Sequence, residues 1–125
     1  MRKLGLAIVT LLVAGGCGPK VDHPPVIDAV MMPETATLGT DNLYTVSGQM
    51  SYHDDDHPVH TLRVKVPLVG MTYEYPAGDL YIGNIDPLTI KFAAQSPKGA
   101  QEYDLSVVDS VGLESAVSVQ MVTLQ

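Results

Sequence analysis

One-by-one alternation of apolar and polar residues recurs along this chain and limits most strongly how it can fold. The pattern runs through LYTVSGQMSY, residues 43–52, and through HTLRVKVP, residues 60–67. Side chains of a β-strand point alternately to its two faces, so the pattern predicts strands with one buried face. The positions expected to face inward are Tyr44, Val46, Gly48, Met50 and Tyr52; Leu62, Val64 and Val66; Leu88, Ile90 and Phe92; Tyr103, Leu105 and Val107; and, in the last strand, Val117, Val119 and Met121.

Turn-forming residues separate these stretches. Weaker strands are predicted at residues 26–31 and 79–83, and no stretch after residue 25 keeps a helical period. About seven short strands separated by turns predict an all-β fold, an Ig-like antiparallel β-sandwich over residues 26–125. Clusters of Gly, Pro, Asn and Asp predict the turns at residues 38–42, 54–58, 75–79, 84–87, 96–99 and 109–112.

The N-terminus has the features of an export signal. Arg2 and Lys3 precede an apolar run, and small residues stand directly before Cys17 in the sequence VAGGC. An apolar run of about a dozen residues is too short to span a bilayer as a helix. The sequence therefore predicts a secretory signal peptide over residues 1–16.

The sequence VAGGC also resembles the lipobox of bacterial lipoproteins. The resemblance implies that Cys17 is lipidated, so that membrane lipid holds the protein through this residue. Gly18 stands where an acidic residue often retains lipoproteins at the inner membrane, which implies the outer membrane or the cell surface of a bacterial envelope. The Pro-rich residues 17–25 are expected to form a tether. The alternative is an ordinary secretory signal that leaves Cys17, the only cysteine, as a free thiol.

The charge balance excludes some partners. The chain has fourteen Asp and Glu residues against seven Lys and Arg, a formal net charge of −7, and two of the basic residues lie in the predicted signal peptide. An acidic surface repels nucleic acid and anionic lipid headgroups, so no nucleic-acid partner is expected. Cationic partners, including metal ions, remain open.

Two longer stretches resemble bacterial Ig-like domains of the PKD and cadherin-like kind. PKGAQEYDLSVVDSVGLES, residues 97–115, is similar to their F strand, F–G turn and start of strand G. VSGQMSYHDDDHPVHTLRVKV, residues 46–66, is similar to their B strand, B–C loop and C strand. The resemblance implies that Tyr103 forms a tyrosine corner, with its ring packed inward and its hydroxyl group bonded to backbone. The Cys pair and Trp of antibody-type domains are missing.

The B–C loop in SYHDDDHPVH, residues 51–60, holds three of the four histidines. The sandwich would bring Asp54 and Asp56 to the same end as Asp109, with Asp22, His23 or Asp28 nearby if the tether folds back. Calcium binds several carboxylate and carbonyl oxygens, so Asp54, Asp56 and Asp109 are the predicted calcium ligands.

Three other interpretations of this loop stay open. The aspartates can cap backbone amides in a solvated turn. His53, His57 and His60 can bind a transition metal such as zinc, because imidazole suits these ions. The loop can also be a tip that binds a protein partner.

No motif for catalysis is present. The chain lacks G-x-S-x-G, H-E-x-x-H and a phosphate-binding glycine loop, so no enzyme activity is expected. The predicted function is that of a membrane-anchored, exported lipoprotein whose Ig-like domain is a structural or protein-interaction module, with calcium as the candidate stabilising ion and the protein partner unspecified. The alternative is a periplasmic metal-binding lipoprotein that uses the loop over residues 53–60.

Overall fold

The computed structural model describes residues 21–125. The predicted signal peptide, Cys17 and the first part of the tether lie outside the described residues. Eight strands follow one another in the described chain: β1 (Val26–Met31), β2 (Thr35–Ala36), β3 (Leu43–His53), β4 (Val59–Val66), β5 (Met71–Leu80), β6 (Ile82–Ala93), β7 (Gly99–Asp109) and β8 (Ser118–Leu124).

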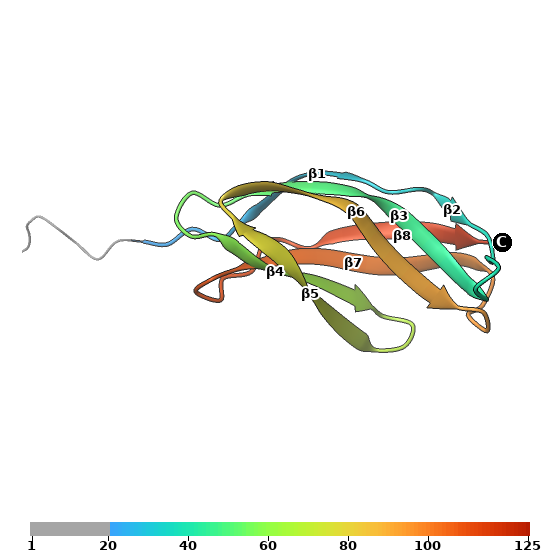
Figure 1. Ribbon diagram of the computed structural model, residues 1–125. Coiled ribbons are helices and arrows are strands. Elements are labelled where there is room, and N and C mark those ends of the chain that lie inside the picture. The colour runs from blue at the N-terminus through green and yellow to red at the C-terminus, as the bar shows by residue number, and fades with distance from the viewer. Residues whose placement is uncertain (1–20) are drawn as a thin grey trace, which may run out of the picture.

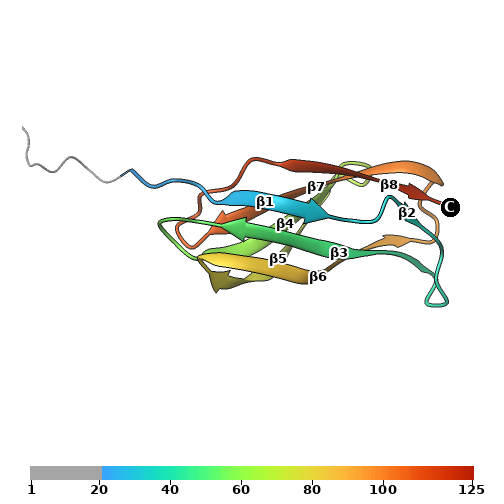
Figure 2. The ribbon, with the colours of Figure 1, turned by 90° about the horizontal axis from the view of Figure 1, so that it is seen from above.

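The strands form two sheets packed face to face (Figure 1). One sheet has the order β1-β3-β6 and the other the order β2-β8-β7-β4-β5. All neighbours are antiparallel except β2 and β8, which pair in parallel. Residue 21 and the loops after β3 and β7 lie at one end of the sandwich, and the C-terminus lies at the other end (Figures 1 and 2).

The predicted inward faces of four strands are confirmed. Alternate residues of β3, β4, β6 and β7 enter one core between the sheets, because each of these strands has one face covered by the opposite sheet. At Gly48 the absence of a side chain matters for a different reason, since a Cβ there would collide with the backbone of Met31 in the neighbouring strand. The confirmed core positions are Tyr44, Val46, Met50, Tyr52, Leu62, Val64, Val66, Leu88, Ile90, Phe92, Tyr103, Leu105 and Val107.

The inward face predicted for the last strand was wrong. Val117, Val119 and Met121 are 55%, 58% and 52% exposed, whereas Val122 and Leu124 are buried. Both sets of alternate residues contain apolar side chains, so the sequence pattern did not decide between them. The register with β7 decides, because it pairs β8 residues of even number with inward-facing residues of β7.

The predicted strand at residues 79–83 and the turns at 75–79 and 84–87 were also wrong. These residues belong to the end of β5 and the start of β6, with Tyr81 at the bend between them. Strand β5 lies at the edge of its sheet and is exposed along most of its length, so it shows no one-by-one alternation. The turns expected at residues 38–42, 54–58, 96–99 and 109–112 are confirmed as connections between strands.

The tyrosine corner expected at Tyr103 is corrected in part. Its ring is fully buried and contacts Phe92 of the opposite sheet edge to face, with centroids 6.3 Å apart. Its hydroxyl group has no hydrogen-bond partner among residues 21–125, and burial raises the pKa of Tyr103 to about 12. Among the buried tyrosines of the described residues, Tyr52 instead bonds backbone, because its hydroxyl group donates to the carbonyl oxygen of Ala77 at 2.8 Å.

The Tyr52 bond joins the two sheets, because Tyr52 lies on β3 and Ala77 on β5. The ring has room because Gly83 stands opposite it in the β3–β6 register, where a Cβ would collide with the phenol. The sequence pattern did not reveal this role of Tyr52, since it predicts inward-facing side chains for both Tyr52 and Tyr103.

We predict opposite effects of removing these two hydroxyl groups. Tyr103→Phe should leave the free energy of unfolding unchanged or raise it by up to about 1 kcal/mol, because a buried hydroxyl group without a partner is lost. Tyr52→Phe should lower it by about 1–2 kcal/mol, because the buried carbonyl group of Ala77 loses its donor. Urea unfolding measures both, and a larger loss for Tyr103→Phe would contradict the assignment.

Candidate functional site

The loop between β3 and β4 is organised by Asp54. One carboxylate oxygen, Oδ1, accepts hydrogen bonds from the backbone amides of Asp56 and His57 at 2.8 and 2.9 Å. The amide of Asp54 donates to the carbonyl oxygen of Tyr81 at 2.7 Å, which fixes the loop to the bend between β5 and β6. The interpretation of a turn capped by an aspartate is therefore confirmed for Asp54, although this side chain is buried rather than solvated.

The loop between β7 and β8 is organised in the same way by Asp109. Its Oδ1 accepts hydrogen bonds from the amides of Val111 and Leu113 at 3.1 and 2.9 Å. The two loops are joined directly, because the amide of Ser110 donates to the carbonyl oxygen of Pro58 at 3.0 Å. Asp54 and Asp109 are each 3% exposed, and the second carboxylate oxygen of each, Oδ2, is buried without a hydrogen-bond partner among the described residues.

The end of the tether folds back onto the β3–β4 loop, as the sequence had left open. The amide and the Nδ1 atom of His23 lie 2.6 and 3.1 Å from Oδ2 of Asp56. In the reverse sense, Nε2 of His57 in the loop lies 3.1 Å from Oδ1 of Asp22 in the tether. Each segment thus supplies one histidine and one aspartate, and we call these two contacts the tether pairs.

A third His–Asp pair lies in the sheet formed by β1, β3 and β6. Nδ1 of His53, the last residue of β3, lies 2.8 Å from both carboxylate oxygens of Asp28 on β1. The pKa of His53 is raised, chiefly by this hydrogen bond and further by the charges of Asp28, Asp55 and Asp54, while burial opposes the shift. The imidazolium form of His53 therefore stabilises the pairing of β1 with β3.

His60 lies apart from the other histidines. The register of β4 shifts between Val59 and Thr61 against both of its neighbours, and His60 is the extra residue at this bulge. Its Nδ1 atom lies 2.7 Å from Oδ1 of Asp79 on β5, with both side chains mostly exposed. His60 therefore lies at the surface of the sandwich and not in its core.

The structure does not gather either predicted set of metal ligands. Within residues 21–125, no three His, Cys, Asp or Glu side chains are grouped so that they could hold a metal ion. His53, His57 and His60 each pair with a different aspartate. Of the predicted calcium ligands, Asp54 and Asp109 cap their own loops, and Asp56 pairs with His23.

Four His–Asp pairs are present in the described residues, and two of their aspartates were not fully predicted. Asp79 was missed, and Asp28 was expected near the loop only if the tether folded back. Asp28 and Asp79 are 25 and 19 residues from their histidines in the sequence. Only strand pairing brings them together, so no local motif signals them. Asp79 also has a positive φ of 58°, which Asp tolerates better than most residues do and which fits its place at the end of β5.

Comparison with known proteins identifies the fold. No protein-family model and no curated protein matches the chain. Among solved structures, the chain is similar to the PKD domain of an M14-like peptidase from Thermoplasmatales archaeon SCGC AB-540-F20, with a TM-score of 0.57 and 20% sequence identity over 83% of this chain and 98% of that one. The likeness confirms the predicted fold, an all-β, Ig-like sandwich. Within residues 21–125, no helix is long and apolar enough to span a membrane.

We predict that stability depends on the protonation of His53. The raised pKa means that the stabilisation is complete below the ordinary histidine pKa of about 6.5 and is lost as the pH rises through the pKa of the folded state. His53→Gln should therefore lower the melting temperature clearly at pH 6 and have little effect at pH 8.5.

His60→Gln is the matched control for this experiment. Its pair with Asp79 is about two-thirds exposed on both sides, so its contribution is screened by water and should be small at either pH. Equal responses of the two variants at pH 6 would contradict a special role of the His53 pair.

Proposed function

We propose that this protein is an exported lipoprotein, anchored through Cys17, whose PKD-like sandwich is a structural or protein-interaction module of the cell envelope. The observation that carries the proposal is the attachment of the tether to one end of the sandwich. Val21 is only a few residues after Cys17, and the tether pairs hold this segment against the β3–β4 loop. An anchor at Cys17 would therefore present the domain with that end towards the membrane.

The module in this proposal is not catalytic. A polar cluster on the outer face of the five-stranded sheet pairs within itself: Arg63 binds Glu74 and Glu114 at 2.8 and 2.9 Å, and the hydroxyl group of Ser106 donates to Glu114. Arg63 partly offsets the charges of the two glutamates, and the Ser106 hydroxyl group donates to Glu114 rather than to a histidine, so the cluster lacks the Ser–His pair of a typical activated nucleophile. The proposed role therefore rests on presenting surfaces and not on chemistry.

Calcium stabilisation is a second part of the proposal. It is supported by the buried, unpartnered Oδ2 atoms of Asp54 and Asp109, which belong to two loops joined by the Ser110–Pro58 hydrogen bond. Because the described residues offer no group of three ligating side chains, backbone carbonyl oxygens and water would complete the coordination shell. No comparable observation favours a zinc site on His53, His57 and His60.

We predict that Cys17→Ser releases the protein from the membrane fraction. A serine cannot accept the thioether-linked lipid, so fractionation and immunoblotting should find most of the protein in the soluble fraction. Ala14→Ser, which keeps a small residue before the cysteine, is the control and should stay membrane-bound. If the Cys17→Ser protein also stays in the membrane fraction, lipid anchoring at this residue is wrong.

We predict that calcium raises the melting temperature of residues 18–125. Calcium at about 100 times its Kd should stabilise the fold by about 2.7 kcal/mol, and a chelator should reverse the shift. Asp109→Asn should reduce the calcium shift, whereas Asp41→Asn, which removes an exposed carboxylate at Lys91, should preserve it. A melting temperature unmoved by calcium, zinc and chelator would contradict both metal hypotheses.

A further inference from the structure

The first half of β8 has an open edge in the part of the chain that the structure describes. On one side, β8 pairs with β7 along its whole length. On the other side, only Thr123 and Leu124 pair with β2, and β1 pairs with β3 in the opposite sheet. Figure 2 shows β1 and β8 running along the same side of the sandwich in different layers. Residues 118–121 therefore have a neighbouring strand on one side alone.

Whether a residue of β8 has an odd or an even number decides to which edge of the strand its backbone groups point. The amides of Thr123 and Gln125 donate to Glu34 and Ala36 at 2.8 and 2.9 Å, so odd-numbered residues direct their backbone groups towards β2. Backbone groups of a strand alternate between its two edges. The amide and carbonyl groups of Val119 and Met121 therefore point to the open edge, where an added strand would pair with them.

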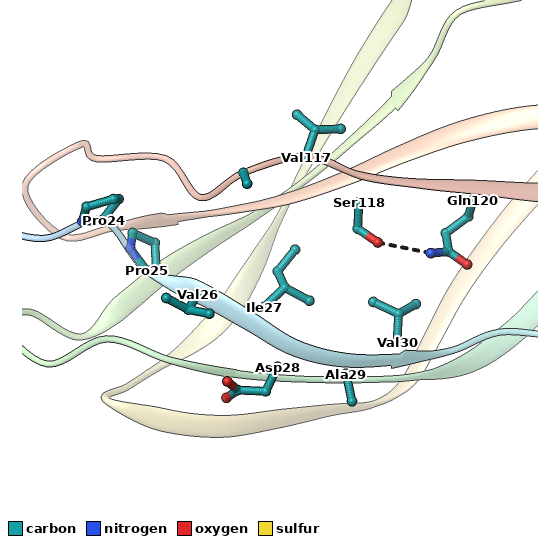
Figure 3. A pocket seen from close by; sticks show the side chains of 11 residues that line it. Pro24, Pro25, Val26, Ile27, Asp28, Ala29, Val30, Val117, Ser118 and Gln120 are labelled. Carbon is teal, nitrogen blue, oxygen red and sulfur yellow. Dashed lines mark hydrogen bonds between the residues drawn. The ribbon is translucent and has the colours of Figure 1, made fainter.

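A groove lies beside this edge, between β1 and the start of β8. Its volume is about 580 Å³, and Pro24 to Val30, Ala116 to Ser118 and Gln120 line it. Figure 3 shows Ile27 and Val30 pointing into it from β1 and Ser118 and Gln120 from β8, while Val117 points away. The groove can receive the side chains of one face of an added strand, next to the apolar Ile27 and Val30.

Two acidic residues of β7 lie near this edge on the outer face of the five-stranded sheet. Val119 and Met121 stand opposite Asp104 and Glu102 of β7 and are more than half exposed. Neither carboxylate has an ion pair within the described residues, although Lys65 is opposite Asp104 in the β4–β7 register. Oδ1 of Asp104 is buried without a hydrogen-bond partner, and the pKa of Glu102 is raised, first by a hydrogen bond with Asp104, then by burial and by the charge of Asp104.

We propose that the open edge of β8 binds an extended protein segment in which every second residue is Lys or Arg. The segment adds to the sheet as a strand beside β8, with its backbone bonded to Val119 and Met121. Its basic side chains cross the exposed Val119 and Met121 with their aliphatic stems and place their charges at Glu102 and Asp104. Its other face fills the groove against Ile27 and Val30.

The distances and charges favour this occupant over a second copy of the chain. An added strand is two strand spacings, about 10 Å, from β7, which a Lys or Arg side chain can bridge to a carboxylate. The β8 segment SVQMVTL of a second copy carries no charge and would leave Glu102 and Asp104 unneutralised, and the two chains would repel each other through their net charge of −7. The inference rests on the proposed role as an interaction module and names the chemistry of the partner.

Fluorescence anisotropy with a labelled nine-residue peptide of alternating Lys and Val tests the proposal. The purified protein should bind this peptide at least tenfold more tightly than the matching Glu and Val peptide. Glu102→Gln with Asp104→Asn should weaken binding at least fivefold. Asp41→Asn with Asp55→Asn, which changes the net charge equally at two exposed positions away from β8, should not.

Blocking the edge gives a second, independent measurement. Val119→Pro removes one amide that faces the open edge, and proline is tolerated there because no bond to β7 is lost. The variant should keep its melting temperature and lose peptide binding at least fivefold. In the wild-type protein, the peptide should slow hydrogen exchange at the amides of Val119 and Met121 at least tenfold.

Three outcomes would overturn the inference. These are equal binding of the Lys and Glu peptides, unchanged binding by Val119→Pro with no slowing of exchange, and sedimentation of the wild-type protein as a dimer that Val119→Pro dissociates. Peptide binding uses the purified protein and does not depend on Cys17. Failure here together with release of Cys17→Ser from the membrane would therefore overturn the β8 partner alone and leave the anchored module in place.

Discussion

The single core layer to which β3 and β7 both contribute is the constraint on which the rest of this sandwich depends. β3 is the middle strand of the three-stranded sheet and β7 that of the five-stranded sheet, and each sends side chains into one shared layer. Tyr52 on β3 and Tyr103 on β7 are among the largest side chains that are fully buried. Because both strands have neighbours on their two sides, their register sets that of the edge strands and the position of the loops at both ends.

This dependence explains how much of the fold the sequence predicted. Alternation is readable where one face is buried, which is the case for β3, β4, the second half of β6 and the first half of β7. It fails for β5, which is exposed on both faces at the edge of its sheet, and the turn residues at 75–79 then give the wrong impression of a loop. For β8, both parities contain apolar residues, and only the register with β7 buries Val122 and exposes Val119. Local pattern alone could not supply that register.

In the candidate site too, contacts between residues close in the sequence were predictable, and contacts between distant residues were not. The capping roles of Asp54 and Asp109 are local, since each bonds amides within four residues, and the Asp-rich turn signalled the role of Asp54 in advance. The His–Asp pairs are distant, because their partners are 19 to 35 residues apart and meet only after the strands have paired. The three histidines of the dense cluster thus pair with three different aspartates, so their closeness in the sequence did not predict where their side chains lie.

The open edge of β8 is itself a consequence of how β1 is held in the other sheet. Near its start, β1 is fixed to β3 by the Asp28–His53 pair. At its end, the backbone of Met31 approaches β3 so closely at Gly48 that any side chain there would collide with it. Between these points, Ile27 and Val30 pack against the core, so β1 has contacts that it would lose by moving to β8. The chain reaches the second sheet only at β2, too late to cover more than the last residues of β8, and the groove and the exposed edge remain on the tether side.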